Sequence, residues 1–174
     1  MAKGKVKNMK VIIYDMSQQL EEVIRAKYVI EDEEAVLIGD DGSIKNCIGC
    51  FNCWIKTPGQ CVLADKYNMM GEKLGHANEL IILSECVYGT FSGFIKNVLD
   101  RSLSYVNPDF TYSRNNEMHH KLRYFNHLQY HVRFYGSCTD EEKLTAQQIV
   151  HANALNFGGE VADIQFFETM EELL

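Results

Sequence analysis

The sequence has little that would divide it into parts or carry it into a membrane. Only two prolines occur among its 174 residues, and we find no repeat, linker or low-complexity stretch. We therefore expect a single domain over residues 9–174, preceded by a flexible N-terminal tail at 1–8. No apolar run is long enough to span a bilayer, and none follows the charged first residues as in a signal peptide. We expect a cytoplasmic protein whose six cysteines are reduced.

Positive charge is also scarce. Lysine and arginine total 17 against 24 aspartates and glutamates, so the formal net charge is −7. Because no basic excess is present to neutralise phosphates, we expect neither a nucleic acid nor an anionic membrane as a partner. Phosphate-loop, G-x-G-x-x-G and Ser-His-Asp patterns are missing as well. The expected partner is a small molecule or another protein.

The apolar residues that are present form short runs that alternate with helical segments. Strands are predicted at 10–14, 35–38, 80–83, 128–135 and, as an edge strand, 161–167. Helices are predicted at 17–28, after Asp65, at 92–105 and at 139–157, whereas 106–126 stays unassigned. This alternation indicates a parallel sheet with helices on both faces, in which ligands bind beyond the carboxyl ends of the strands.

Capping residues mark several predicted helix starts. Asp15 is followed three residues later by Gln18, and Thr139 by Glu142, which are capping-box spacings. Ser92 is expected to cap the helix that follows the third strand.

Four of the six cysteines lie together as C-x2-C-x2-C-x7-C, at Cys47, Cys50, Cys53 and Cys61. Thiolates at this spacing are able to converge on one metal centre, an iron–sulfur cluster or a zinc ion, although the close spacing suits zinc less well. They are also able to be small buried hydrophobic residues in a helix and its flanking loop. A thiol or metal sensor is a third interpretation.

The motifs Cys-Ile-Gly-Cys-Phe-Asn-Cys-Trp, Lys-Thr-Pro-Gly-Gln-Cys and Tyr-Gly-Thr-Phe-Ser-Gly-Phe-Ile-Lys, followed by Asp100-Arg101, occur in order between residues 47 and 101. This third of the chain resembles the flavodoxin-like NAD(P)H-dependent FMN reductases, and among them the iron–sulfur flavoproteins. The resemblance implies a three-layer α/β flavodoxin-like fold whose five-stranded parallel sheet has the order 2-1-3-4-5.

The resemblance also implies FMN as a cofactor and electron transfer from NAD(P)H, or to a redox protein, as by an NAD(P)H-dependent flavin oxidoreductase. Contacts to the flavin would come from Ser17, Cys86, Val87, Tyr88, Gly89, Thr90 and Phe91. Cys47, Cys50, Cys53 and Cys61 would hold a [4Fe–4S] cluster. Alternatively, the resemblance implies a packed loop with Phe51 and Trp54 in the core. Such proteins commonly form homodimers, and the aromatic segment 105–112 would serve the subunit contact.

One departure from the family pattern affects the cofactor. The family follows its first strand with a Gly-Ser-Pro-Arg type of loop that wraps the FMN phosphate, but here the strand leads directly into Asp15-Met-Ser17. Asp15, Glu21 and Glu22 would repel a phosphate. The alternative hypothesis is therefore a flavodoxin-like protein that no longer binds FMN alone and acts as a partner or interaction subunit.

Overall fold

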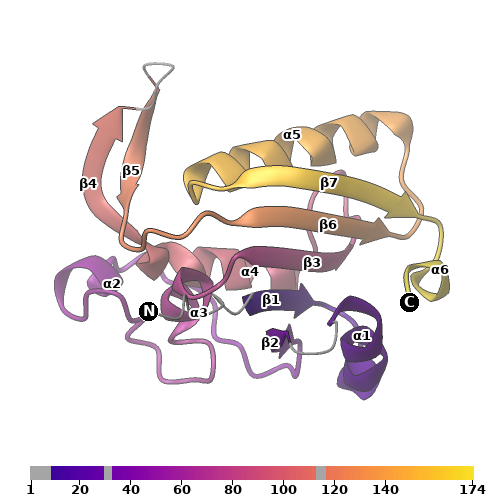
Figure 1. The fold of residues 1–174 in the computed structure, drawn as a ribbon, viewed down its shortest axis with the longest axis horizontal. Helices are drawn as coiled ribbons and strands as arrows, with labels where there is room; N and C mark the ends of the chain where they lie inside the picture. Colours follow the sequence, from indigo (N-terminus) through magenta and orange to yellow (C-terminus); the bar gives the residue numbers. More distant parts are fainter. Residues whose placement is uncertain (1–8, 30–32, 113–116) are drawn as a thin grey trace, which may run out of the picture.

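The computed structural model describes residues 9–29, 33–112 and 117–174, so the tail predicted at 1–8 lies outside the described residues. Its main sheet has five parallel strands in the order β2-β1-β3-β6-β7 (Figure 1). The strands are β1 Met9–Tyr14, β2 Glu34–Gly39, β3 Glu79–Glu85, β6 Gln129–Tyr135 and β7 Glu160–Phe167. Counted along the chain this is the order 2-1-3-4-5, so the predicted flavodoxin-like architecture is confirmed.

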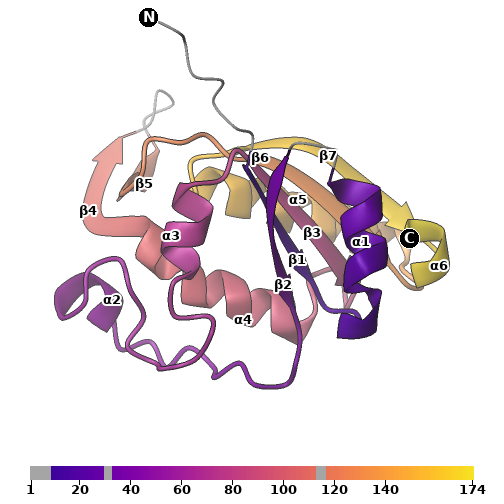
Figure 2. The same ribbon diagram turned by 60° about the horizontal axis from the view of Figure 1, so that its bottom comes forward.

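Each face of the sheet buries its own apolar cluster. On the first face lie α3 Met70–Gly75, α4 Gly93–Arg101 and α5 Asp140–Asn156, and on the second lie α1 Glu21–Tyr28 and α6 Met170–Leu173 (Figure 2). Buried and half-buried side chains alternate along β6 because successive residues point to opposite faces of the sheet. Tyr130, Val132 and Phe134 are buried on the first face. The intervening His131 and Arg133 lie on the second face, which fewer helices cover.

The predicted caps of α4 and α5 are confirmed. The Ser92 hydroxyl accepts a hydrogen bond from the Ile95 amide, and Thr139 and Glu142 form a reciprocal capping box. A 3-10 helix, η1 Gln18–Leu20, precedes α1, and a second, η2 Ser102–Tyr105, continues α4. None of the helices in the described part of the chain is long and apolar enough to cross a membrane.

The segment left unassigned from sequence forms an antiparallel hairpin. It consists of β4 Val106–Tyr112 and β5 Met118–Leu122, and it projects from the end of the molecule opposite α6 (Figure 1). Tyr105, which we expected to serve a subunit contact, is fully buried in the core. Phe110 and Tyr112 are exposed and stay available for such a contact.

A buried ion pair attaches the long connection after β2 to α4. The guanidinium of Arg101 donates to both carboxylate oxygens of Asp65 at 2.8 Å and to the Lys45 carbonyl at 2.7 Å. The helix cap predicted for Asp65 is wrong: its carboxylate caps only the turn at Tyr67, and α3 begins at Met70. Lys45 and Asp65 lie on either side of residues 47–61, which contain the four clustered cysteines and are called the cysteine segment below. Arg101 therefore fixes both ends of this segment.

We expect Asp65→Asn to lower the free energy of unfolding by about 3–5 kcal/mol, because it leaves the buried guanidinium of Arg101 without its counter-charge. Urea denaturation measures this loss. Arg25→Gln, which removes an exposed pair with Glu21, is the control and should cost about 0.5 kcal/mol or less.

The same pair makes stability depend on pH. The hydrogen bond from Arg101 lowers the pKa of Asp65 in the folded protein. The stabilisation is therefore complete above the unfolded pKa of about 3.9 and is lost as the pH falls through the lower folded value. Between about pH 5 and pH 3 the free energy of unfolding of the Asp65→Asn variant should fall less than that of the native protein. Equal decreases in the two proteins, measured by urea denaturation at each pH, would contradict this.

Candidate functional site

Three loops meet at the carboxyl edge of the sheet, where the arrowheads of β3, β6 and β7 point towards α6 (Figure 1). They follow the adjacent strands β1, β3 and β6. The chain order reverses between β1 and β3, which is the point where open parallel sheets bind their ligands. This edge is therefore the first place to look for a site.

The loop after β3 is a tight two-residue turn. The amides of Val87 and Thr90 each donate to the other's carbonyl, at 2.9 and 3.1 Å. The two residues between them, Tyr88 and Gly89, have φ angles of +51° and +72°, as in a type I′ turn. A Cβ at Gly89 would lie 2.9 Å from the Glu142 carbonyl oxygen, so both the angle and the space require glycine there.

This turn separates the predicted flavin contacts into two kinds. The Tyr88 side chain is 89% exposed, and its left-handed backbone costs about 1 kcal/mol, a strain that is typical of functional sites. Phe91 is instead buried and stacks on Phe134, with ring centroids 5.3 Å apart. Cys86 is also buried, whereas Val87 and Thr90 are half-buried. Of the predicted flavin contacts, only Tyr88 presents an exposed aromatic ring.

The loop after β1 carries a carboxylate, that of Asp15, which hydrogen-bonds to the ends of the neighbouring strands. Asp15 accepts hydrogen bonds from the Glu85 amide at 2.9 Å, the Ser84 hydroxyl at 3.3 Å and the Tyr135 hydroxyl at 2.9 Å. The prediction that Asp15 caps a helix is therefore wrong; it joins the ends of β1, β3 and β6. Burial, followed by the neighbouring carboxylates of Asp15 and Glu85, raises the pKa of Tyr135 and keeps its hydroxyl a donor.

Ser17, the predicted phosphate contact, caps η1 rather than a long helix. Its exposed hydroxyl accepts from the Gln19 amide at 3.4 Å. The α-helix that follows begins with Glu21 and Glu22. Negative side chains at a helix N-terminus compete with a bound anion for the same backbone dipole. The loop after β1 thus offers no evident phosphate cradle.

The cysteine segment lies along α4, away from the carboxyl edge. The Cys47 amide donates to the side chain of Asn97 at 3.1 Å, and the Trp54 indole donates to the carbonyls of Leu103 and Val106 at 3.1 and 3.0 Å. The four cysteines of this segment line one cavity of about 20 Å³, and Arg101 also lines it. Among the described residues, no three His, Cys, Asp or Glu side chains are arranged to hold one metal ion.

The core placement expected for the two aromatic residues of this segment holds only in part. Trp54 packs against the core, but Phe51 is 48% exposed.

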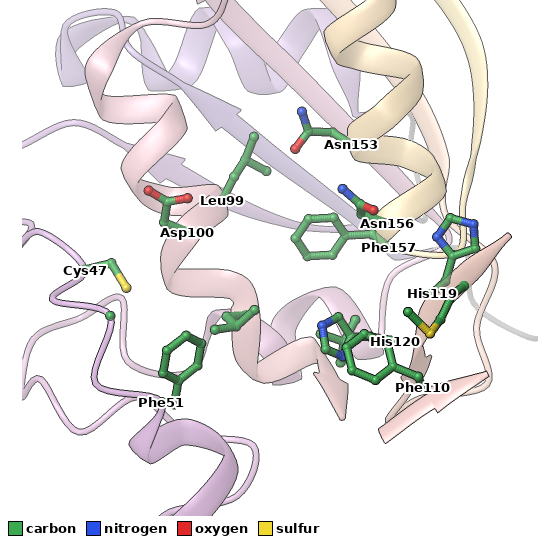
Figure 3. A pocket seen from close by; sticks show the side chains of 14 residues that line it. Cys47, Phe51, Leu99, Asp100, Phe110, His119, His120, Asn153, Asn156 and Phe157 are labelled. Carbon is green, nitrogen blue, oxygen red and sulfur yellow. The ribbon is translucent and has the colours of Figure 1, made fainter. Parts of the chain in front are cut away.

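A larger cavity, of about 390 Å³, lies between the cysteine segment, α4, the hairpin and the end of α5 (Figure 3). Phe51, Phe110 and Phe157 make much of its wall aromatic (Figure 3). It shares three lining residues with a cavity of about 220 Å³ beside Thr90. A groove between α4 and α5 therefore connects the turn after β3 with the hairpin.

The chain has a flavodoxin-like fold. No family model matches the sequence, and none of the curated proteins matches it. Azoreductase AzrA aligns with a TM-score of 0.62 and 10% identity, covering 95% of this chain and 89% of that chain. An FMN-dependent NADH-azoreductase from Bacillus anthracis str. Ames Ancestor, solved in complex with FMN, aligns at 0.56 and 15% identity, covering 96% and 89%.

A third similar structure is the apo form of the NADH:FMN oxidoreductase EMOB. It aligns with a TM-score of 0.54 and 13% identity, covering 92% of this chain and 75% of that chain. At identities this low, the three likenesses establish a shared fold and leave the chemistry to be argued from the site.

Sequence reasoning missed two features of the carboxyl edge. Asp15 has a polar environment that only the packing of neighbouring strands creates. Cys138 belongs to no cysteine motif, and the signal that places it at this edge is its position between a strand and the Thr139 cap. In the structure its sulfur lies 2.8 Å from that of Cys86.

We expect Asp15→Asn to lower the free energy of unfolding by about 1.5–3 kcal/mol, because an amide NH2 group replaces one charged acceptor and faces a donor. Equilibrium urea denaturation provides the measurement. Asp100→Asn, on the exposed side of α4, is the matched control and should change stability by no more than about 0.5 kcal/mol. Equal stability of the two variants would show that Asp15 does not hold the strand ends together.

Proposed function

We propose that this protein is an FMN-binding redox protein, which passes electrons from a reduced nicotinamide to a small acceptor or a redox partner. The exposed ring of Tyr88, held in a strained turn at the strand-order reversal, is the observation that carries this proposal. An aromatic face at this position is able to stack on a flavin ring. The FMN-bound azoreductase of the same fold supports the choice of cofactor.

The chain's own residues would bind and orient the flavin ring. FMN, when bound, supplies the electron-transfer chemistry, and the protein holds its ring and excludes competing reactions. In the proposal the turn at 86–91 contacts one side of the ring. The groove between α4 and α5 provides room for a small acceptor, since its cavities fall near the range of ordinary ligand pockets.

The phosphate end of the cofactor would be held weakly. Asp15 already uses the donors at the end of β1, and Glu21 and Glu22 add negative charge. We therefore propose that the site recognises the ring and scarcely distinguishes FMN from riboflavin. The same observation favours the alternative function, a flavodoxin-like interaction subunit that binds no flavin alone.

We also propose a homodimer in the cytoplasm that uses the hairpin. Phe110, Tyr112 and Met118 are 53%, 71% and 58% exposed there, which is typical of an interaction surface. A monomer mass by light scattering would contradict the dimer.

A [4Fe–4S] cluster is a second candidate for the cysteine segment. Four thiols around one cavity supply one ligand for each iron, and the buried guanidinium of Arg101, which is ion-paired with Asp65, lines the same cavity. The Nε atom of Arg101 has no hydrogen-bond partner among the described residues and is suited to donate to a sulfur. The present cavity holds about one water molecule, so the exposed turn from Cys47 to Cys50 would have to open.

Flavin titration distinguishes the two main functions. We expect FMN and riboflavin to bind with dissociation constants within about threefold of each other, whereas each charge-assisted phosphate contact would favour FMN by about tenfold or more. Tyr88→Ala should weaken both flavins about fivefold through lost stacking. Phe125→Ala, which removes a fully exposed aromatic ring elsewhere, is the control. Absence of binding by either flavin would favour the interaction subunit.

Anaerobic reconstitution with ferrous iron and sulfide tests the cluster. The expected result is a brown protein with about four irons per chain, and Cys53→Ser or Cys61→Ser should lower the iron content. Circular dichroism shows whether each variant is folded. A native protein that stays colourless and free of iron would retire the cluster.

A further inference from the structure

Two thiols from distant parts of the sequence meet at the carboxyl edge. Cys86 and Cys138 are 52 positions apart, and their Sγ atoms lie 2.8 Å from each other. The parallel pairing of β3 with β6 brings them together, because Glu85 is the register partner of Tyr135. The Cys86 amide then donates to the Tyr135 carbonyl at 2.9 Å, which extends the ladder to the first thiol itself.

The surroundings of the pair are asymmetric. Cys86 is buried beneath the turn that contains Tyr88, whereas Cys138 is half-buried directly before the Thr139 cap of α5. A disulfide has an S–S bond of about 2.05 Å, so the two sulfurs need to approach by less than about 1 Å to bond. The elements that carry them are adjacent, so no rearrangement of the sheet is needed.

We propose that Cys86 and Cys138 are a redox-active dithiol, which exchanges with disulfides of low-molecular-weight thiols. The thiolate of Cys138 attacks one sulfur of the small disulfide, which forms a mixed disulfide and releases the first small thiol. Cys86 then attacks the Cys138 sulfur, forms the Cys86–Cys138 bond and releases the second. The protein dithiol loses two electrons and two protons, and the small disulfide becomes two thiols.

The order of the two attacks follows from access and charge. Cys138 reaches solvent, so an incoming disulfide meets it first. Burial, followed by the contact with Cys138, raises the pKa of Cys86, which suits a thiol that reacts only after its partner has been modified. Well below that pKa, the thiolate fraction of Cys86 rises about tenfold for each pH unit, and the closing step should accelerate accordingly.

This dithiol does not depend on the proposed flavin. A bond between the two sulfurs would tie the turn at 86–91 to the start of α5, where Gly89 already packs closely against Glu142. The bond would thereby fix the position of Tyr88. The reaction is testable in the flavin-free protein, so its failure would leave the flavin proposal standing, and the reverse also holds.

The test is equilibration of the reduced, full-length protein with glutathione buffers of defined oxidised-to-reduced ratio, folded and in concentrated urea. Acid quenching, alkylation and peptide mass spectrometry quantify the Cys86–Cys138 bond. We expect its equilibrium constant to be at least about tenfold larger in the folded protein, because a flexible loop dilutes the two thiols to the millimolar range or below. Closure should also be faster at pH 9 than at pH 7.

Single variants separate the two roles. Cys86→Ser should accumulate a stable mixed disulfide between glutathione and Cys138, whereas Cys138→Ser should leave Cys86 reduced. Ser137→Ala, next to the reactive thiol, is the matched control and should behave as the native protein. Circular dichroism identifies any variant that fails to fold. In that case the amount of the Cys86–Cys138 bond in the native protein, measured by peptide mass spectrometry, tests the proposal. The proposal would be overturned if the equilibrium constant for the Cys86–Cys138 disulfide were no larger in the folded protein than in the unfolded protein.

Discussion

The carboxylate of Asp15 is the constraint on which the carboxyl edge depends. It joins three strand ends by accepting from the Glu85 amide and from the hydroxyls of Ser84 and Tyr135. Hydrogen bonds to a charged acceptor are among the stronger ones in proteins, so Asp15 holds the ends of β1, β3 and β6 together. In the proposed function, the same carboxylate would place negative charge near the phosphate end of the flavin.

In the proposed function, this edge would bind the ring of the flavin and would hold its phosphate only weakly. The turn at 86–91 presents Tyr88 to solvent, while Asp15 and the acidic start of α1 disfavour an anion. Beneath the turn, Cys86 and Cys138 add a pair of thiols that the same strand pairing brings together. Flavin binding and thiol exchange would both act on this one turn, which links the two proposals structurally without making either depend on the other.

The cysteine segment is organised by a separate interaction. Arg101 holds Lys45 and Asp65 on either side of it, and Trp54 attaches its middle to η2 and the hairpin. The four thiols consequently surround one small cavity on the outer side of α4, not the turn at Tyr88. A groove between α4 and α5 connects the two regions, so a ligand in the larger cavity would contact the segment and the hairpin together.

Local sequence determined most of the fold. Short β-branched runs, the Thr139 capping box and the alternation after residue 128 predicted the parallel sheet and most of its helices, because periodicity and caps act within one element. The strand order was predicted only from the resemblance of residues 47–101 to a known family. The hairpin at 106–122, the true partners of Asp15 and Asp65, and the meeting of Cys86 with Cys138 were decided only by tertiary structure. These features depend on which strands are neighbours and on their register, and side chains far apart in sequence acquire shared chemistry only when the sheet is assembled.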